Sequence, residues 1–115
     1  YWDYDAPVTE ETPRDASAAS VTASALIELS TMVPDGQKYL DYAEKILKSL
    51  SSDAYLAKVG DNQGFILMHS VGSLPNGSEI DTPLNYADYY YLEALKRFME
   101  LKKLRVEHGE LRMIQ

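Results

Sequence analysis

The amino-acid sequence predicts an all-α fold, and three observations support this class. Apolar residues make up 45% of the 115 residues, which is enough for a packed core. In three segments they recur three and four positions apart, as on one face of a helix. Glycines, prolines and small polar residues fall between these segments, where the connections between helices are expected.

The first expected helix follows Thr12-Pro13-Arg14-Asp15 and runs to about Thr31. Asp15 or a neighbouring residue is placed to cap its free N–H groups. The segment is rich in alanine and serine, with small residues on most faces. We therefore expect a helix that neighbours pack closely on several sides.

The second expected helix spans residues 37–51, after the turn at residues 33–36. One face carries apolar residues and the opposite face carries charges, which is typical of a helix with water on its outer side. The apolar positions are Tyr39, Leu40, Ala43, Ile46, Leu47 and Leu50.

The stretch between the second and third helices has fewer regular signals. Residues 52–56 predict a short turn, and residues 65–70 form an apolar run that is either β-like or extended and buried. Residues 71–78 contain Gly72, Pro75, Asn76 and Gly77, which predict a loop.

The third expected helix opens at Thr82-Pro83 and runs to about Lys103, with Tyr90, Tyr91 and Phe98 at core spacing. Four tyrosines and Asp88 crowd its start. Aromatic rings stack on sugar rings, and phenols and carboxylates hydrogen-bond sugar hydroxyls. This helix start therefore indicates a sugar site. Residues 105–115 are highly charged and are expected to form a terminal extension.

The overall composition limits the classes of partner. The net charge of −7 argues against a nucleic-acid or anionic-membrane binder, whose binding surface would be basic. No apolar run approaches the roughly 18 residues that span a bilayer. The chain has no cysteine, and its two histidines, His69 and His108, lie far apart. We expect no nucleic acid, membrane, metal or cofactor among its partners.

The order of a buried helix, an exposed amphipathic helix, a polar loop and another buried helix is typical of an α/α toroid. A helical solenoid alternates such helices too. However, the chain contains no recurring repeat of the expected length.

Four motifs resemble the C-terminal part of the unsaturated glucuronyl hydrolases, glycoside hydrolase family 88. They occur in the order Trp2-Asp3-Tyr4-Asp5-Ala6-Pro7, Thr12-Pro13-Arg14-Asp15-Ala16-Ser17-Ala18-Ala19, Gly64-Phe65-Ile66-Leu67-Met68-His69-Ser70-Val71-Gly72 and Ile80-Asp81-Thr82-Pro83-Leu84-Asn85-Tyr86-Ala87-Asp88-Tyr89-Tyr90-Tyr91-Leu92-Glu93-Ala94-Leu95. The resemblance implies that residues 1–104 are part of an (α/α)6 barrel and that the remainder of the barrel lies outside this chain.

The resemblance also implies an activity. Family members remove a 4,5-unsaturated glucuronic acid from oligosaccharides that polysaccharide lyases produce. An aspartate protonates C4 of the vinyl ether, water adds at C5, and the hemiketal rearranges to release the sugar, without metal or cofactor. The two catalytic aspartates belong to the family's N-terminal half, so no catalytic residue is expected in this chain. The isolated chain is expected to be inactive and poorly stable.

The same resemblance implies that a loop at about residues 69–78 contacts the substrate. Its candidate contacts are His69, Ser70, Ser73 and Ser78, with Tyr86 and Asp88 at the rim of the site. This loop has no lysine or arginine, which argues against a strong preference for sulfated sugars. A histidine at such a position is more often structural, and Asp15 is most simply a helix cap.

Two other functions stay open at this point. The related unsaturated rhamnogalacturonyl hydrolases share the barrel and the chemistry, and a non-catalytic carbohydrate-binding or scaffold module is a different class. Two aspartates at helix starts upstream of the chain would distinguish an enzyme from a binding module. The resemblance suggests a bacterial origin. The residues do not decide between a cytoplasmic and a periplasmic location.

Overall fold

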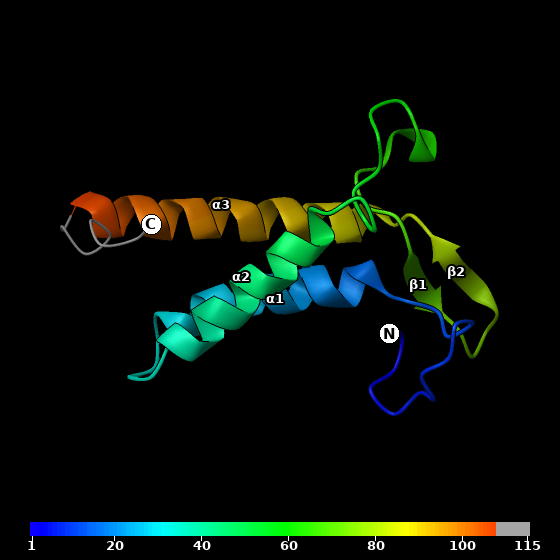
Figure 1. Cartoon of the computed structure of the whole chain (residues 1–115), viewed down its shortest axis with the longest axis horizontal. Coiled ribbons are helices and arrows are strands. Elements are labelled where there is room, and N and C mark those ends of the chain that lie inside the picture. Colours follow the sequence, from blue (N-terminus) through cyan, green and yellow to red (C-terminus); the bar gives the residue numbers. More distant parts are fainter. Residues whose placement is uncertain (108–115) are drawn as a thin grey trace.

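The computed structural model describes residues 1–107 of the chain. Its elements follow the order α1 (Ala16–Ser30), α2 (Gln37–Leu50), the 3-10 turn η1 (Asn62–Gly64), β1 (Ser70–Ser73), β2 (Ser78–Thr82) and α3 (Asn85–Glu107) (Figure 1). No helix in this described part combines the length and the hydropathy that crossing a membrane requires.

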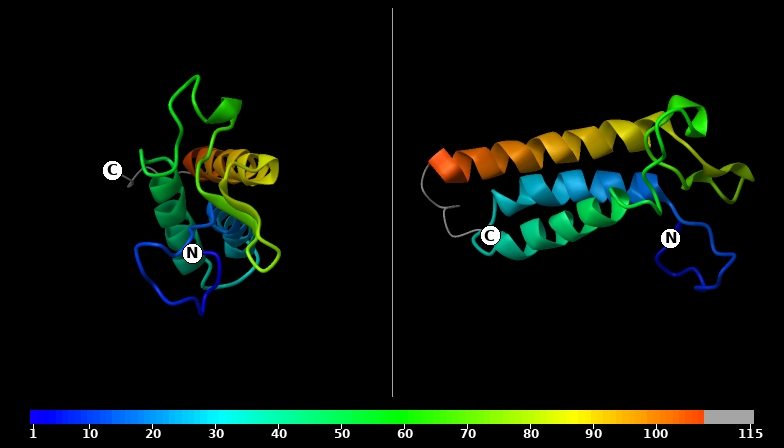
Figure 2. Two further views of the ribbon diagram at one scale, coloured as in Figure 1. Left: turned by 90° about the vertical axis from the view of Figure 1, so that its right-hand side faces the viewer. Right: turned by 45° about the horizontal axis from the view of Figure 1, so that its top comes forward.

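The three helices form a layered group in which α1 contacts both of the others. Helices α1 and α3 run in the same direction, with their N-termini at the end that carries β1 and β2, and α2 runs back between them in sequence (Figures 1 and 2). This is the alternation that the sequence predicts for an α/α toroid.

Helix α1 begins after Asp15, whose carboxylate accepts a hydrogen bond from the Ser17 N–H at 3.0 Å. The predicted cap is confirmed. The buried residues of α1 have mostly small side chains, which lets the neighbouring helices approach closely. They are Ala16, Ser17, Ser20, Ala23, Ser24 and Ile27.

Helix α2 buries Leu40, Ala43, Leu47 and Leu50 and exposes most of its charged residues, which confirms the predicted amphipathic helix. The turn before it is tight at Gly36. A Cβ atom at this position would lie 1.8 Å from the carbonyl oxygen of Ser30. Only glycine therefore fits where the chain leaves α1 and enters α2.

Helix α3 packs one side against α1. Ala87, Tyr91 and Ala94 are buried there, and the predicted core residues Tyr90 and Phe98 are half-buried. The other side carries large apolar groups in contact with water. Tyr89, Leu92 and Met99 are each more than half exposed.

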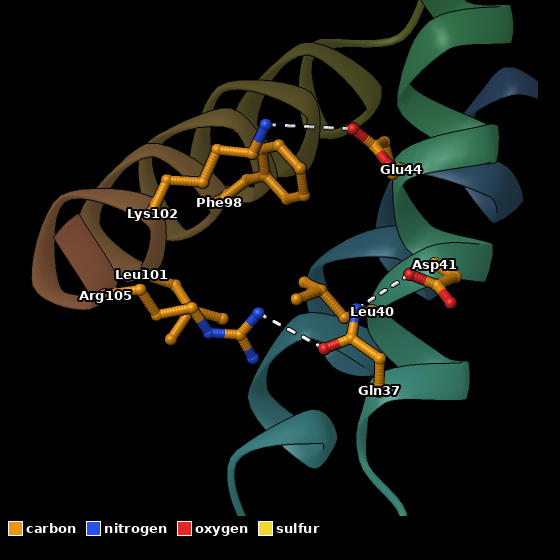
Figure 3. Close-up of a pocket in the computed structure, with 8 residues that line it drawn as sticks. All are labelled: Gln37, Leu40, Asp41, Glu44, Phe98, Leu101, Lys102 and Arg105. Carbon is orange, nitrogen blue, oxygen red and sulfur yellow. Dashed lines mark hydrogen bonds and ion pairs between the residues drawn. The ribbon is translucent and has the colours of Figure 1, made fainter. Parts of the chain in front are cut away.

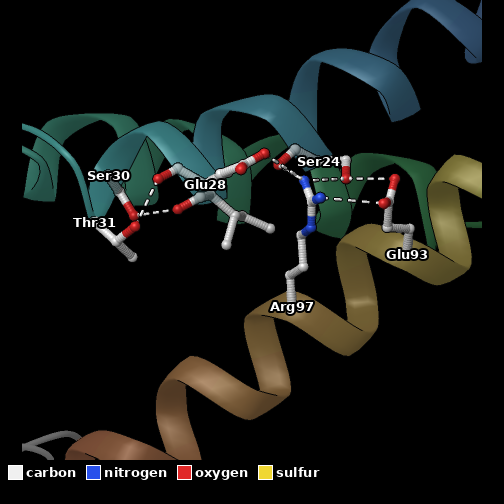
Figure 4. A network of polar contacts seen from close by, with 7 residues as sticks. Ser24, Glu28, Ser30, Thr31, Glu93 and Arg97 are labelled. Carbon is white, nitrogen blue, oxygen red and sulfur yellow. Dashed lines mark hydrogen bonds and ion pairs between the residues drawn. The ribbon is translucent and has the colours of Figure 1, made fainter.

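A polar network joins α1 to α3 near the middle of both helices (Figure 4). The Arg97 guanidinium donates to the Ser24 carbonyl at 3.0 Å and forms ion pairs with Glu93 at 3.2 Å and Glu28 at 3.3 Å. Ser24 also donates its hydroxyl to Glu93. Because Arg97 is only partly exposed, these bonds hold the two helices in one register more firmly than a surface ion pair would.

The structure bears out the β-like alternative for residues 65–70, since Leu67 lies in a β-bridge and Ser70 begins β1. Leu67 is fully buried and pairs with Leu56 in an isolated antiparallel bridge. The Ala57 N–H donates to the Ile66 carbonyl at 2.9 Å, and the Met68 N–H donates to the Tyr55 carbonyl at 2.8 Å. This apolar run therefore pairs with residues 55–57 in a strand-like manner and adds Leu67 to the core.

The structure corrects two predictions that follow this run. Residues 71–78 do not form a simple loop, because β1 and β2 pair as an antiparallel hairpin with Val71 opposite Ile80 and Ser73 opposite Ser78. The all-α class is confirmed, with this small sheet added. Thr82 ends β2, so α3 begins at Asn85 and not at Thr82-Pro83.

Helix α3 also extends past the predicted end at Lys103, to Glu107. The first residues of the predicted extension at 105–115 thus continue the helix. Residues 108–115, which include His108, lie outside the described part of the chain.

Candidate functional site

The predicted site residues lie at the end of the molecule where the N-termini of α1 and α3 meet the hairpin (Figures 1 and 2). They come from the end of the extended segment, from both strands and from the first turn of α3. These residues are His69, Ser70, Ser73, Ser78, Tyr86 and Asp88.

Asp15 joins the helix end to the hairpin. Its Oδ1 atom accepts from the Ser17 N–H at 3.0 Å, from the Ser17 hydroxyl at 2.5 Å and from the Val71 N–H at 3.1 Å. The predicted cap therefore also holds the first residues of β1.

Asp88 contacts the protein through both carboxylate oxygens. Oδ2 accepts from the Ile66 N–H at 2.9 Å and Oδ1 accepts from the Leu67 N–H at 3.0 Å. The sequence suggested this carboxylate as a sugar ligand at the rim. Within this chain its bonds go to the backbone of the extended segment.

His69 stands where the extended segment turns into β1. Its backbone is left-handed, with φ at 65°, and its carbonyl accepts from the Ala16 N–H at 2.9 Å. The ring Nδ1 lies 2.5 Å from Asp81 Oδ1, and the ring meets Tyr55 edge to face with centroids 6.2 Å apart. Arg14 lies over the same Tyr55 ring at 6.0 Å.

His69 opens onto a cavity of about 320 Å³ between the segment before α1 and strand β2. The lining combines carboxylates, one guanidinium and one imidazole, so it offers both donors and acceptors to a polar ligand. Its residues are Glu10, Glu11, Thr12, Pro13, Arg14, His69, Ile80 and Asp81.

The three candidate serines differ in exposure. Ser70 is completely buried, and its Oγ has no hydrogen-bond partner among the described residues. Ser73 is half-buried and Ser78 is exposed, and the two face each other across the hairpin. Of the three candidate serines, Ser73 and Ser78 therefore present their hydroxyl groups toward solvent and Ser70 does not.

Tyr86 is 41% exposed at the start of α3. Partial burial raises the pKa of its phenol above the ordinary 10.0, and the negative charges of Glu79 and Asp15 raise it further. A hydrogen bond with Ser17 acts in the opposite direction. The phenol is therefore held in its neutral form, in which it both donates and accepts hydrogen bonds.

Sequence reasoning missed Asp81 and Glu79 as part of this site. Both have left-handed backbone, with φ of 51° and 54°, and these two positive φ angles make strand β2 irregular. Neither residue is a glycine, so the sequence gives no sign of this left-handed backbone conformation. Among residues 1–107, no group of histidine, aspartate or glutamate side chains is arranged to hold a metal ion.

A separate cavity of about 250 Å³ lies at the opposite end of the helices, between α2 and α3 (Figure 3). Leu40, Phe98 and Leu101 give it apolar walls, and Lys102 reaches Glu44 at 3.8 Å across it. None of the predicted site residues lines it. Its side chains are already paired with each other, so it offers fewer free polar groups to a sugar than the hairpin end does.

Comparison with known proteins identifies relatives of the chain. No protein-family model matches it. The unsaturated glucuronyl hydrolase of Formosa agariphila is 50% identical over 101 residues, which cover 88% of this chain and 25% of that protein. The chain thus spans about a quarter of the length of this curated relative.

Solved structures agree with the sequence match. An unsaturated glucuronyl hydrolase specific for heparin superposes with a TM-score of 0.85 and 70% identity over 89% of this chain and 28% of that one. The glycosaminoglycan-degrading unsaturated glucuronyl hydrolase of Bacillus sp. GL1 gives a TM-score of 0.76 and 29% identity over 95% of this chain and 28% of that one.

The fold and these likenesses define part of an α/α barrel like that of these relatives. The alternation of buried and exposed helices predicted from the sequence is the one that an α/α barrel has. By sequence and structure, the chain is similar to unsaturated glucuronyl hydrolases, and it spans about a quarter of the length of these relatives.

Proposed function

We propose that this chain is the C-terminal part of an enzyme that removes 4,5-unsaturated glucuronic acid from glycosaminoglycan oligosaccharides. The observation that carries this proposal is the 70% identity, at a TM-score of 0.85, to a glucuronyl hydrolase specific for heparin. This match covers 89% of the chain and 28% of that enzyme. The substrate is then the unsaturated product of a polysaccharide lyase.

The proposed reaction is hydration of the vinyl ether. A proton adds to C4 of the double bond and the hydroxyl of a water molecule adds to C5. The resulting hemiketal opens, and the aglycone sugar leaves from C1. Protonation of C4 by a carboxylic acid is general acid catalysis. The aspartates proposed for this step lie outside this chain.

Part of the site in this chain consists of neutral hydrogen-bonding groups. Ser73, Ser78 and the Tyr86 phenol are accessible, and His69 lines the polar cavity between the segment before α1 and strand β2. Neutral donors suit sugar hydroxyls, which carry no charge. We propose that these side chains contact the sugar that follows the unsaturated uronate, and that Ser70 supports them from below.

Heparin-derived substrates are favoured over other glycosaminoglycan fragments. The support is the printed specificity of the 70% identical enzyme. The hairpin itself has no lysine or arginine between residues 69 and 82. A sulfate group would therefore be bound here by hydroxyl and backbone N–H donors, and any basic contact would come from other parts of the barrel.

The test uses the full-length parent protein and the ultraviolet absorbance of the conjugated double bond. Unsaturated disaccharides prepared from heparin, chondroitin, hyaluronan and pectin are compared. Loss of absorbance with the heparin product, at a higher kcat/KM than with the others, is the expected result. Loss only with the pectin product would assign the protein to the rhamnogalacturonyl class, and no loss with any substrate would leave a binding module.

Serine variants then test the contribution of this chain. Ser73→Ala and Ser78→Ala are expected to raise KM several-fold, because each removes one hydrogen bond to the sugar worth about 1 kcal/mol. Ser49→Ala is the matched control, since Ser49 is exposed on α2 and belongs neither to the hairpin nor to the cavity that His69 lines. Equal KM values in all three variants would contradict the proposed contacts.

A further inference from the structure

We propose that Asp88 is a positioning residue for the reaction described above, and that it acts through His69. Together with Asp15, it holds residues 66–71 in a fixed path, and this path aims the His69 ring into the polar cavity. The inference rests on the proposed function. It differs from the sequence-based expectation that Asp88 contacts the sugar directly.

The first step of the reasoning is the geometry at Asp88. Two consecutive backbone N–H groups, those of Ile66 and Leu67, donate to its two oxygens at 2.9 Å and 3.0 Å. Charge-assisted bonds of this kind are stronger than neutral ones. Because Leu67 is fully buried, an unpaired N–H at this position would be costly. Asp88 therefore fixes the segment just before His69.

The second anchor lies on the other side of His69. The Val71 N–H donates to Asp15 Oδ1 at 3.1 Å, and the His69 carbonyl accepts from the Ala16 N–H at 2.9 Å. Both contacts belong to the N-terminus of α1. The segment is thus attached to α3 before His69 and to α1 at and after it.

The two anchors together set the backbone conformation of His69. Its φ of 65° is left-handed, a conformation that costs a non-glycine residue about 1 kcal/mol or more and persists only where the surroundings impose it. Here the two anchors impose it. The turn directs the ring away from the core, toward Asp81 and the cavity that Arg14 also lines.

The decisive experiment is a double-mutant cycle on kcat/KM in the full-length parent protein, with the heparin-derived disaccharide as substrate. Asp88→Asn keeps the size of the side chain but replaces one acceptor by an NH2 group that faces a backbone N–H. We expect about a tenfold loss of kcat/KM for Asp88→Asn. In a His69→Ala background the same change is expected to cost less than about twofold, because residues that act through one another are not additive.

Two results of this cycle would overturn the proposal. Equal losses in both backgrounds would mean that Asp88 contacts the sugar independently of His69. A lower unfolding temperature with unchanged kcat/KM would mean that Asp88 is only structural. Glu100→Gln is the matched control, since it makes the same charge change on the exposed side of α3, and it is expected to leave kcat/KM unchanged.

Hydrogen exchange provides a second test, and its wild-type measurement does not depend on a variant folding. In the wild-type protein without substrate, the amides of Ile66 and Leu67 are expected to exchange slowly. In Asp88→Asn they are expected to exchange faster, with the middle of α3 unchanged. Fast exchange in the wild type would overturn the proposal. If the wild type turns over no substrate, the proposed function fails on its own, and the exchange rates still report on the anchor.

Discussion

Replacing Asp15 by alanine removes one oxygen that three donors share, and its effect on stability is calculated from those contacts. The loss of the cap on the Ser17 N–H costs about 1 kcal/mol. The Val71 N–H, on a residue that is 7% exposed, is left without its acceptor, which costs about 1–3 kcal/mol. The expected total for Asp15→Ala is about 2–4 kcal/mol.

The assay is native-state hydrogen exchange at the amides of Ser17 and Val71 in the full-length protein, because it reports the free energy of local opening. Asp15→Asn is the matched variant. Asparagine keeps a side-chain oxygen and caps helices about as well as aspartate, so its expected loss is under about 1 kcal/mol. Equal losses for Asp15→Ala and Asp15→Asn would refute the reasoning, since the charge and not the shared acceptor would then matter.

Three further changes have predictable results. Leu67→Ala leaves a cavity in the core and is expected to lower the free energy of unfolding by about 2–5 kcal/mol in urea titrations, whereas a loss below about 1 kcal/mol would show that the extended segment is not packed as described. Gly36→Ala places a methyl group 1.8 Å from the Ser30 carbonyl oxygen and is expected to lower the melting temperature; an unchanged value would contradict the tight turn. Tyr86 has a raised pKa in the folded state, so its stabilising contribution is complete below pH 10 and is lost as pH rises through the folded pKa. The stability difference between wild type and Tyr86→Phe should therefore shrink in alkaline solution, and a constant difference would refute the shift.

The helices were predictable because their signals are local. The apolar residues of α2 recur at helical spacing, and its bounds agree with the expected range to within a residue. Asp15 caps α1 as expected for an aspartate before an alanine-rich segment. Both features depend on residues only a few positions apart, which a sequence displays directly.

The hairpin was not predictable for the same reason. The five residues of β2 are polar apart from Ile80, so they show no apolar alternation. Glu79 and Asp81 adopt positive φ angles within β2, a backbone conformation that is uncommon for residues other than glycine. The strand ends at Thr82, which delays the start of α3.

The candidate site was predicted in position but not in its internal contacts. The sequence placed Tyr86 and Asp88 at a helix start near the residue 69–78 region, as the structure does. It could not indicate that Asp88 bonds to amides 21 and 22 residues away, or that His69 pairs with Asp81 12 residues on. Such partners depend on how the chain folds back, and polar side chains have many alternatives until that path is set.

The alanine- and serine-lined contact between α1 and α3 has a consequence for substrate accommodation. Helices that meet through such short side chains have little slack, because any sliding would bring backbone against backbone. The ion pairs of Arg97 also hold α1 and α3 together near the middle of both helices. Asp15, at the start of α1, and Asp88, in the first turn of α3, therefore stay at a constant distance from each other. In the proposed enzyme, adjustment to sugars of different bulk falls to the hairpin, whose outer strand β2 is paired along one edge only.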